Sequence, residues 1–135
     1  HQEWYYIPEE TRKLIRSTKE KNCPVVAVGT TTLRALESIY MLSNKDISHI
    51  ERHTNKWHTT DLFLYPKTKE DIYNPWCVDA MITNFHLPES TLFMMICYLI
   101  GYKRAQRVYQ HAIENKYRFY SYGDSSLLWL KDFTP

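Results

Sequence analysis

Short stretches of the chain alternate between apolar and polar side chains, and the clearest alternation runs through residues 78–83. A period of two predicts a strand. A polar corner follows at residues 84–86, and the next stretch, Leu92–Ile100, contains no charged residue. Such a helix is expected to be surrounded by protein on every side. The pattern therefore predicts a strand, a corner and a buried helix in succession, with Pro88 in the first turn of the helix.

The other elements follow from the same two periods and from the positions of proline and glycine. Gly101 is placed to end the buried helix. Residues 43–58 show no clear period and are predicted to be irregular, and residues 67–75 are predicted to lie on the surface. Further strands are predicted at residues 3–7, 24–28, 61–65, 117–120 and 127–130, and further helices at residues 8–21, 30–40 and 103–116.

The strand at residues 24–28 is short and apolar, which is typical of a parallel sheet that is buried on both faces. In the first predicted helix, Leu14 and Ile15 are expected to face the core. Strands that alternate with helices indicate an α/β fold. We therefore predict an α/β domain with a mostly parallel sheet flanked by helices, without repeats or internal linkers.

Composition places the chain among folded proteins. Its 135 residues are 44% hydrophobic, and its formal net charge of +2 permits contact with nucleic acid without arguing for it. Three cysteines without a C-x-x-C pair exclude a disulfide framework or a zinc ribbon and favour a cytoplasmic location. No apolar run approaches the roughly 20 residues of a membrane span. The chain starts at His1, and we expect it to be part of a longer polypeptide.

The first candidate site is a hydroxyl-rich segment between a strand and a helix. Backbone N–H groups, hydroxyls and a guanidinium at one helix N-terminus can bind a phosphate, a carboxylate or a ribose. The alternative is a threonine helix cap in which Arg34 pairs with Glu37 or Ser38 on the next turn. The segment consists of Gly29, Thr30, Thr31, Thr32, Leu33 and Arg34.

The second candidate site is the polar corner after the strand at residues 78–83. Asn84 and His86 have the chemistry to orient a substrate and to move a proton near neutral pH. The alternative is structural: His86 donates to a backbone carbonyl, and Asn84 closes the turn. Asp79 is most simply a strand residue with a local partner.

The third candidate site is the aromatic segment Tyr117–Asp124, in which Arg118, Tyr122 and Asp124 stand close together. Aromatic faces beside a carboxylate can hold a purine-like ring. A core strand with one ion pair is the competing explanation.

Two other polar patterns favour solvent exposure over a site. His49, His53 and His58 have a spacing that resembles metal ligands, but they lack an obvious acidic or cysteine partner, so we interpret them as solvated and expect no metal. The cations of the last predicted helix can touch a phosphate backbone, although a solvated face is the more frequent outcome. They are Lys103, Arg104, Arg107 and His111.

Four blocks of sequence point to one family. Residues 28–38 resemble the VGTTxxRxLES segment of S-adenosylmethionine:tRNA ribosyltransferase-isomerases, the enzymes of the queuosine pathway. The other three blocks are residues 60–66, 78–92 and 114–124, and all four occur in the family's order. Together they extend over nearly the whole chain, so chance agreement is very improbable.

The resemblance implies a specific reaction. Members of this family transfer the ribosyl part of S-adenosylmethionine to 7-aminomethyl-7-deazaguanine at the wobble position of the tRNA anticodon. The ribose is isomerised, and the products are epoxyqueuosine, adenine and methionine. No metal or cofactor beyond S-adenosylmethionine is implied.

The resemblance also implies roles for the candidate residues. The segment Gly29–Arg34 would hold a carboxylate, a ribose or a tRNA phosphate, and Asn84 and His86 would line the reaction pocket. Asp79 would also contact the substrate, and Arg118, Tyr122 and Asp124 would help to hold a base. The general base is not identified by the resemblance.

The resemblance covers only the C-terminal portion of the family, without its N-terminal part and β-barrel insertion. Residues 1–135 are therefore expected to be the C-terminal part of the α/β domain of a longer enzyme, with the N-terminal part as a partner. The main alternative is a non-catalytic domain that binds RNA or a nucleotide. A hydrolase that uses His86 with Ser90 or Cys97 fits poorly, because no acidic residue is placed to orient the histidine.

Overall fold

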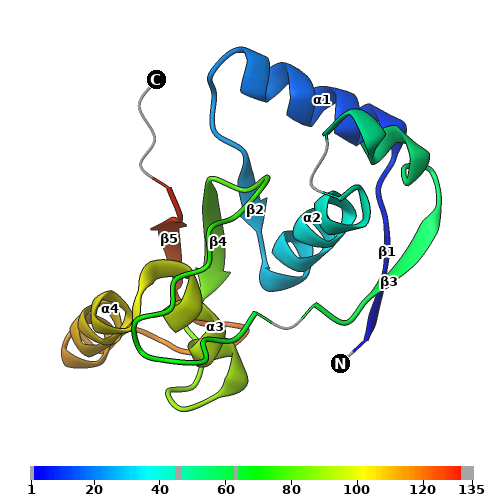
Figure 1. Ribbon diagram of the computed structural model, residues 1–135. Helices are drawn as coiled ribbons and strands as arrows, with labels where there is room; N and C mark the ends of the chain where they lie inside the picture. Colours follow the sequence, from blue (N-terminus) through cyan, green and yellow to red (C-terminus); the bar gives the residue numbers. More distant parts are fainter. Residues whose placement is uncertain (1, 45–46, 63, 132–135) are drawn as a thin grey trace.

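The computed structural model describes residues 2–44, 47–62 and 64–131. Ten elements follow one another along the chain (Figure 1). They are β1 (Glu3–Tyr6), α1 (Glu9–Glu20), β2 (Val26–Val28), α2 (Thr30–Leu42), η1 (Ile47–Arg52), β3 (Trp57–Thr60), β4 (Ala80–Asn84), α3 (Thr91–Ile100), α4 (Tyr102–Glu114) and β5 (Ser125–Trp129).

The strands form two sheets, and α2 packs between them (Figure 1). One sheet has the order β2-β4-β5, with β2 parallel and β5 antiparallel to β4. The other consists of the antiparallel pair β1 and β3. The predicted α/β class with flanking helices is confirmed, but the sheet is mixed and not mostly parallel, because only the pair β2 and β4 is parallel. The parallel pair β2 and β4 runs directly into α2 and α3, so both helices begin near the same edge of the sheet.

Two predicted strands are wrong. The strand in the middle of the chain is β3, at Trp57–Thr60, within and just after the segment that was predicted to be irregular. Its position is set by pairing with β1, where His58 lies opposite Tyr5 and the two rings stack at 5.5 Å. Residues 61, 62, 64 and 65 are not in a strand, and residue 63 lies outside the described residues. Residues 117–120 also form no strand, because they belong to a closed loop.

Helices α3 and α4 form where the sequence pattern predicts helices, but Pro88 precedes the Ser90 cap and does not lie in the first turn of α3. In α3, Ile96 and Leu99 are almost fully buried, and Gly101 ends the helix with a φ of 91° while its N–H donates to the Cys97 carbonyl at 2.9 Å. A positive φ favours glycine at this position. In α4, Ala105, Tyr109 and Ala112 are buried.

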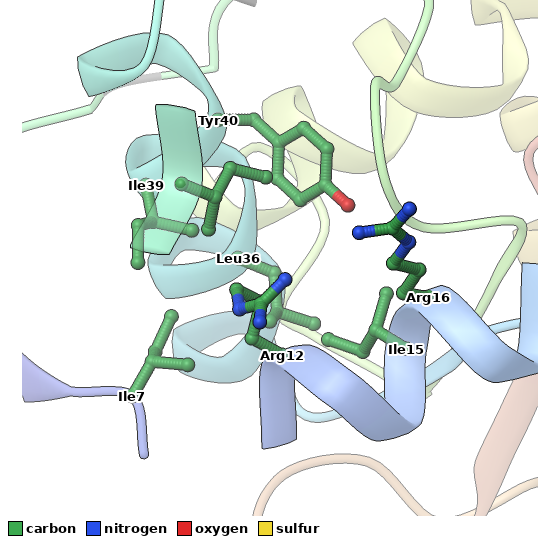
Figure 2. A pocket seen from close by; sticks show the side chains of 8 residues that line it. Ile7, Arg12, Ile15, Arg16, Leu36, Ile39 and Tyr40 are labelled. Carbon is green, nitrogen blue, oxygen red and sulfur yellow. The ribbon is translucent and has the colours of Figure 1, made fainter. Parts of the chain in front are cut away.

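Helix α1 packs differently from the prediction. Leu14 is 68% exposed, and α1 has no buried residue. Ile15 packs against the core as predicted, and together with Arg12 it lies beside Leu36 of α2 (Figure 2). The space left between them is about 10 Å³, room for about one water molecule. Leu14 was misplaced because the inward face of α1 is formed partly by the stem of a charged side chain.

The sheet β2-β4-β5 is buried on one face only. Ala27, Met81 and Leu128 lie side by side in the register and face the core. The opposite face is apolar and open, which corrects the prediction that the strand at residues 24–28 is buried on both faces. Its exposed side chains are Val26 (40%), Val28 (67%), Leu127 (53%) and Trp129 (45%). We call these four residues the open sheet face.

Candidate functional site at the carboxyl ends of β2 and β4

Gly29 forms the corner between β2 and α2. Its φ is 94°, which a residue with a side chain rarely adopts, and its N–H donates to the Ile82 carbonyl of β4 at 2.8 Å. The helix therefore begins against the carboxyl end of β4. Gly29 occupies the N-cap position, so the alternative of a threonine cap is wrong. Thr30 lies in the first turn of α2, and Thr31 and Thr32 are exposed there.

Arg34 reaches back from α2 to β1. Its Nη1 donates to Glu3 Oε2 at 2.9 Å, and its Nε donates to the Leu62 carbonyl at 2.9 Å. The side chain of Arg34 is only 16% exposed in this ion pair. The pairing with Glu37 or Ser38 that the sequence suggested is wrong, because Glu37 accepts from Tyr73 and from the N–H groups of Trp76 and Cys77, and Ser38 is hydrogen-bonded to Thr60.

The N-terminus of α3 lies at the same edge. Ser90 caps this helix, since its Oγ accepts from the Phe93 N–H at 3.1 Å. Ser90 is thus occupied and Cys97 is buried, which leaves no nucleophile for the hydrolase alternative. A hollow of about 320 Å³ separates the first turns of α2 and α3. It is lined by Glu3, Thr30, Arg34, Leu62, Leu64, Thr91, Leu92 and Met95; we call it the α2–α3 hollow.

The electrostatics of the α2–α3 hollow suit a small ligand that carries both charges. Two helix N-termini supply positive ends of dipoles, and the half-buried ion pair places a guanidinium beside a carboxylate. Leu64, Leu92 and Met95 supply an apolar wall. A volume of about 320 Å³ is at the lower end of the roughly 300–1,000 Å³ that ligand pockets occupy.

Asn84 and His86 lie where β4 ends. His86 Nε2 is 2.9 Å from Thr83 Oγ1, and the His86 N–H donates to Tyr109 Oη at 3.0 Å. Burial lowers the pKa of His86 below its usual value of 6.5, so the imidazole is neutral at pH 7. Asn84 Nδ2 donates to the Ser121 carbonyl at 3.1 Å, which ties the end of β4 to the aromatic segment.

The aromatic segment is a closed loop at residues 118–124. Asp124 accepts from the Arg118 N–H at 2.7 Å and donates its own N–H to the Arg118 carbonyl at 2.8 Å. A Cβ at Gly123 would lie 2.5 Å from the Arg118 carbonyl oxygen, so the loop can close only with glycine there. The predicted side-chain ion pair is replaced by these backbone bonds. Arg118 and Tyr122 are exposed on the outside of the loop.

The structure thus brings the predicted residues into two groups at one edge of the sheet. Gly29, Thr30 and Arg34 lie at the first turn of α2, and Asn84, His86 and the loop at residues 118–124 lie at the end of β4. Asp79 stands apart from both groups. It precedes β4 at the opposite end of the strand, where its Oδ2 accepts from the Val25 N–H at 2.8 Å.

Sequence reasoning missed residues that come from distant parts of the chain. Glu3 lies 31 positions before its partner Arg34, and neither the sequence period nor a motif connects them. Glu37 is fully buried and accepts from Tyr73 Oη and from the N–H groups of Trp76 and Cys77 at 2.7–2.9 Å. In the sequence, Glu37 stands between apolar residues on the inward face of α2. This position was the signal from which its burial could have been predicted.

The three histidines are not a metal site in the part of the chain that the structure describes, which contains no cluster of metal-ligating side chains. They are also not simply solvated. His58 Nε2 is bonded to the His53 carbonyl at 2.8 Å, and its ring stacks on Tyr5. Within the described residues, no helix has the length and apolarity that a membrane crossing needs.

Fold and site together describe an α/β domain with a ligand hollow at the carboxyl ends of two parallel strands. Residues 1–128 match the family described as Queuosine biosynthesis protein, and the chain belongs to that family. It is 39% identical, over 142 residues, to the S-adenosylmethionine:tRNA ribosyltransferase-isomerase of Buchnera aphidicola subsp. Schizaphis graminum. That alignment covers 100% of this chain and 35% of the Buchnera protein.

The fold also matches a solved structure, that of the S-adenosylmethionine tRNA ribosyltransferase from Thermotoga maritima. The TM-score is 0.74 at 38% sequence identity, with 92% of this chain and 39% of the Thermotoga chain covered. The chain therefore spans little more than a third of the length of either relative.

Proposed function

We propose that residues 1–135 form the C-terminal part of the α/β domain of an S-adenosylmethionine:tRNA ribosyltransferase-isomerase. The enzyme would transfer the ribosyl moiety of S-adenosylmethionine to 7-aminomethyl-7-deazaguanine at the tRNA wobble position and isomerise it. Epoxyqueuosine, adenine and methionine are the products, and no metal or further cofactor takes part. A tRNA substrate is consistent with a cytoplasmic location of the enzyme.

The observation that carries this proposal is the α2–α3 hollow. The methionine part of S-adenosylmethionine bears a carboxylate and an ammonium group, and the hollow places Arg34 2.9 Å from Glu3. On binding, the guanidinium would pair with the carboxylate and Glu3 with the ammonium group. The apolar wall formed by Leu64, Leu92 and Met95 would accept the aliphatic part of the ligand.

His86 and Asn84 are proposed to act on the ribosyl group. Attachment of a ribosyl carbon to an amine releases a proton, and isomerisation moves others, so a base is needed near neutral pH. His86 is half-buried and neutral at pH 7. When its Nε2 donates to Thr83, Nδ1 carries the lone pair that accepts a proton. Asn84 would orient the substrate beside it.

The open sheet face supports a partner for this domain. Val26, Val28, Leu127 and Trp129 are between 40% and 67% exposed, and an apolar sheet face is normally covered by a second layer. The relatives contain more than half of their length outside the matched region. We propose that the remaining part of the family polypeptide covers this face.

The alternative remains a non-catalytic domain that binds RNA or a nucleotide. The two proposals differ in adenine release. The test system is a chimaeric enzyme in which residues 1–135 replace the matched segment of the Buchnera relative. Adenine release that depends on both S-adenosylmethionine and tRNA supports the catalytic proposal, whereas tRNA binding without adenine release supports the alternative.

Replacement of Arg34 by alanine in the chimaeric enzyme is expected to raise the KM for S-adenosylmethionine about ten- to hundredfold, the usual effect of losing a hydrogen bond to a charged group. Arg34→Lys should recover only part of the loss, because lysine cannot form the planar two-bond contact. Steady-state kinetics of adenine release provide the measurement, with thermal unfolding as a check on the fold. Arg16→Ala, which removes an exposed ion pair with Glu20, is the matched control. A KM within twofold of the parent value for Arg34→Ala would rule out this role.

A further inference from the structure

The outward face of α4 carries a cluster of positively charged side chains. Residues 102–118 contain five lysine or arginine residues and one glutamate, a net charge of +4, although the whole chain carries only +2. The other 118 residues are therefore slightly acidic in total. Lys103, Arg104 and Arg107 are all exposed, so a strong charge asymmetry is confined to one helix and the turn that follows it.

Within the described part of the chain, no ion pair involves a cation of α4. This differs from α1, where Arg12 pairs with Glu9 and Arg16 with Glu20. The one acid on the α4 face, Glu114, accepts from Gln110 instead. Lys103, Gln106, Arg107, Gln110, His111 and Glu114 follow one another along one open face of the helix.

The basic face continues into exposed aromatic rings. Near the C-terminal end of this face, the His111 and Tyr117 rings meet edge to face with centroids 5.6 Å apart. The closed loop that follows exposes Tyr120 (61%) and Tyr122 (98%). Tyr122 is therefore almost free of contact with the rest of the protein, which is unusual for an aromatic side chain.

The loop that carries these rings is hydrogen-bonded to the candidate functional site at the end of β4. Asn84 Nδ2 binds the Ser121 carbonyl, and the Tyr120 N–H donates to the Phe85 carbonyl at 2.9 Å. Both bonds join the loop to the carboxyl end of β4, next to His86. A ligand that contacts the α4 cations and the tyrosines would therefore reach the candidate catalytic residues.

We propose that this surface binds an RNA stem-loop, with the α4 cations on the phosphates of the stem and the tyrosine rings stacked on unpaired bases of the loop. Phosphate contacts position a nucleic acid, and bases in RNA loops are typically recognised by stacking on aromatic side chains. A regular duplex would not expose its bases to Tyr120 and Tyr122. The inference rests on the proposed function, and it identifies which surface receives the anticodon arm of the tRNA.

The test is fluorescence anisotropy with a labelled anticodon stem-loop RNA and the 135-residue chain. The double variant Lys103→Glu/Arg107→Glu is expected to weaken binding at least about tenfold at 0.1 M salt, and to reduce the slope of log K against log salt by about 1.5 or more. The matched control is Lys13→Glu/Lys21→Glu, which reverses one exposed charge on α1 and one at its C-cap and should change affinity less than twofold.

A second variant separates stacking from charge. Tyr122→Ala is expected to weaken binding of the stem-loop about fivefold or more and to leave binding of a blunt RNA duplex unchanged. Because Tyr122 is 98% exposed, its loss should not affect folding. The inference is overturned if the parent chain does not bind the stem-loop, if the α4 and α1 double variants behave alike, or if polyglutamate competes as well as RNA.

Failure of this inference is distinct from failure of the proposed function. If the chimaeric enzyme releases adenine with tRNA while the α4 variant keeps the parent affinity, the reaction stands and the RNA lies elsewhere. If the chimaeric enzyme binds tRNA through α4 but releases no adenine, the surface stands and the reaction does not.

Discussion

Replacing His86 with alanine in the chimaeric enzyme is expected to lower kcat for adenine release by about 10²- to 10⁴-fold, the usual contribution of a general base. The KM for S-adenosylmethionine should change little, because His86 lies at the end of β4 and not among the residues that line the α2–α3 hollow. Single-turnover release of adenine measures the chemical step directly. A kcat within threefold of the parent would remove His86 from the mechanism.

The pH dependence provides an independent readout of the same residue. Burial lowers the pKa of His86 below 6.5, and the base is active only when neutral. Activity should therefore be fully present at pH 7 and fall as the pH drops through that lowered pKa. This acidic limb should disappear in His86→Gln, which keeps a side-chain hydrogen bond within reach of Thr83 but does not titrate. Thr83→Val is the matched control, since it retains the imidazole, and should move the limb without abolishing it. A limb that persists unchanged in His86→Gln assigns the titration to another group.

Replacing Glu37 with alanine is expected to lower the free energy of unfolding by about 3 kcal/mol or more. The carboxylate is fully buried and accepts three hydrogen bonds, from Tyr73 Oη and from the N–H groups of Trp76 and Cys77. Its removal takes the acceptor away from three donors, of which the Cys77 N–H is buried, and opens a cavity. Since residues 73–77 lead into β4, the loss should also loosen the strand that carries Asn84.

Urea denaturation followed by circular dichroism measures the effect of the Glu37 variants. Glu70→Ala, on the exposed segment at residues 67–75, is the matched control and should change stability by less than about 0.5 kcal/mol. Glu37→Gln should lie between the two, because the amide retains one acceptor oxygen but presents an N–H₂ group to donors. Equal stability of Glu37→Ala and the parent would contradict the role assigned to this carboxylate.

Local patterns predicted the helices and the corner residues well. The uncharged stretch at residues 92–100 forms most of α3, Gly101 ends that helix, and the helix predicted at residues 103–116 is α4. These features depend on neighbouring residues alone, so a sequence contains the information directly. The corners after β2 and β4 were found for the same reason.

Features that depend on distant partners were not predicted. β3 lies at residues 57–60 because its register is set by β1, more than fifty positions earlier. The loop at residues 118–124 has strand-like composition, but Asp124 and Gly123 close it through bonds to the backbone of Arg118. The place of Glu3 in the α2–α3 hollow also depends on a distant partner, because its contact with Arg34 exists only in the folded chain.

The open sheet face was not predicted, because the strand at residues 24–28 is entirely apolar. Residues 24–28 read as a strand that is buried on both faces, and in the 135-residue chain only one face is covered. The pattern is consistent with the proposal that the remaining part of the family polypeptide supplies the second layer. On that proposal the sequence pattern describes the environment of the strand in the complete enzyme.

The most direct test of the proposed function compares adenine release by the chimaeric enzyme and by the Buchnera relative from which the matched segment has been deleted. Both are incubated with S-adenosylmethionine and with tRNA that carries 7-aminomethyl-7-deazaguanine, and adenine and modified tRNA are quantified together. We predict that the chimaeric enzyme releases adenine in equal amount to the epoxyqueuosine formed, and that the deleted enzyme releases none. A folded chimaeric enzyme that binds tRNA without releasing adenine would contradict the proposal and leave the chain as a binding domain.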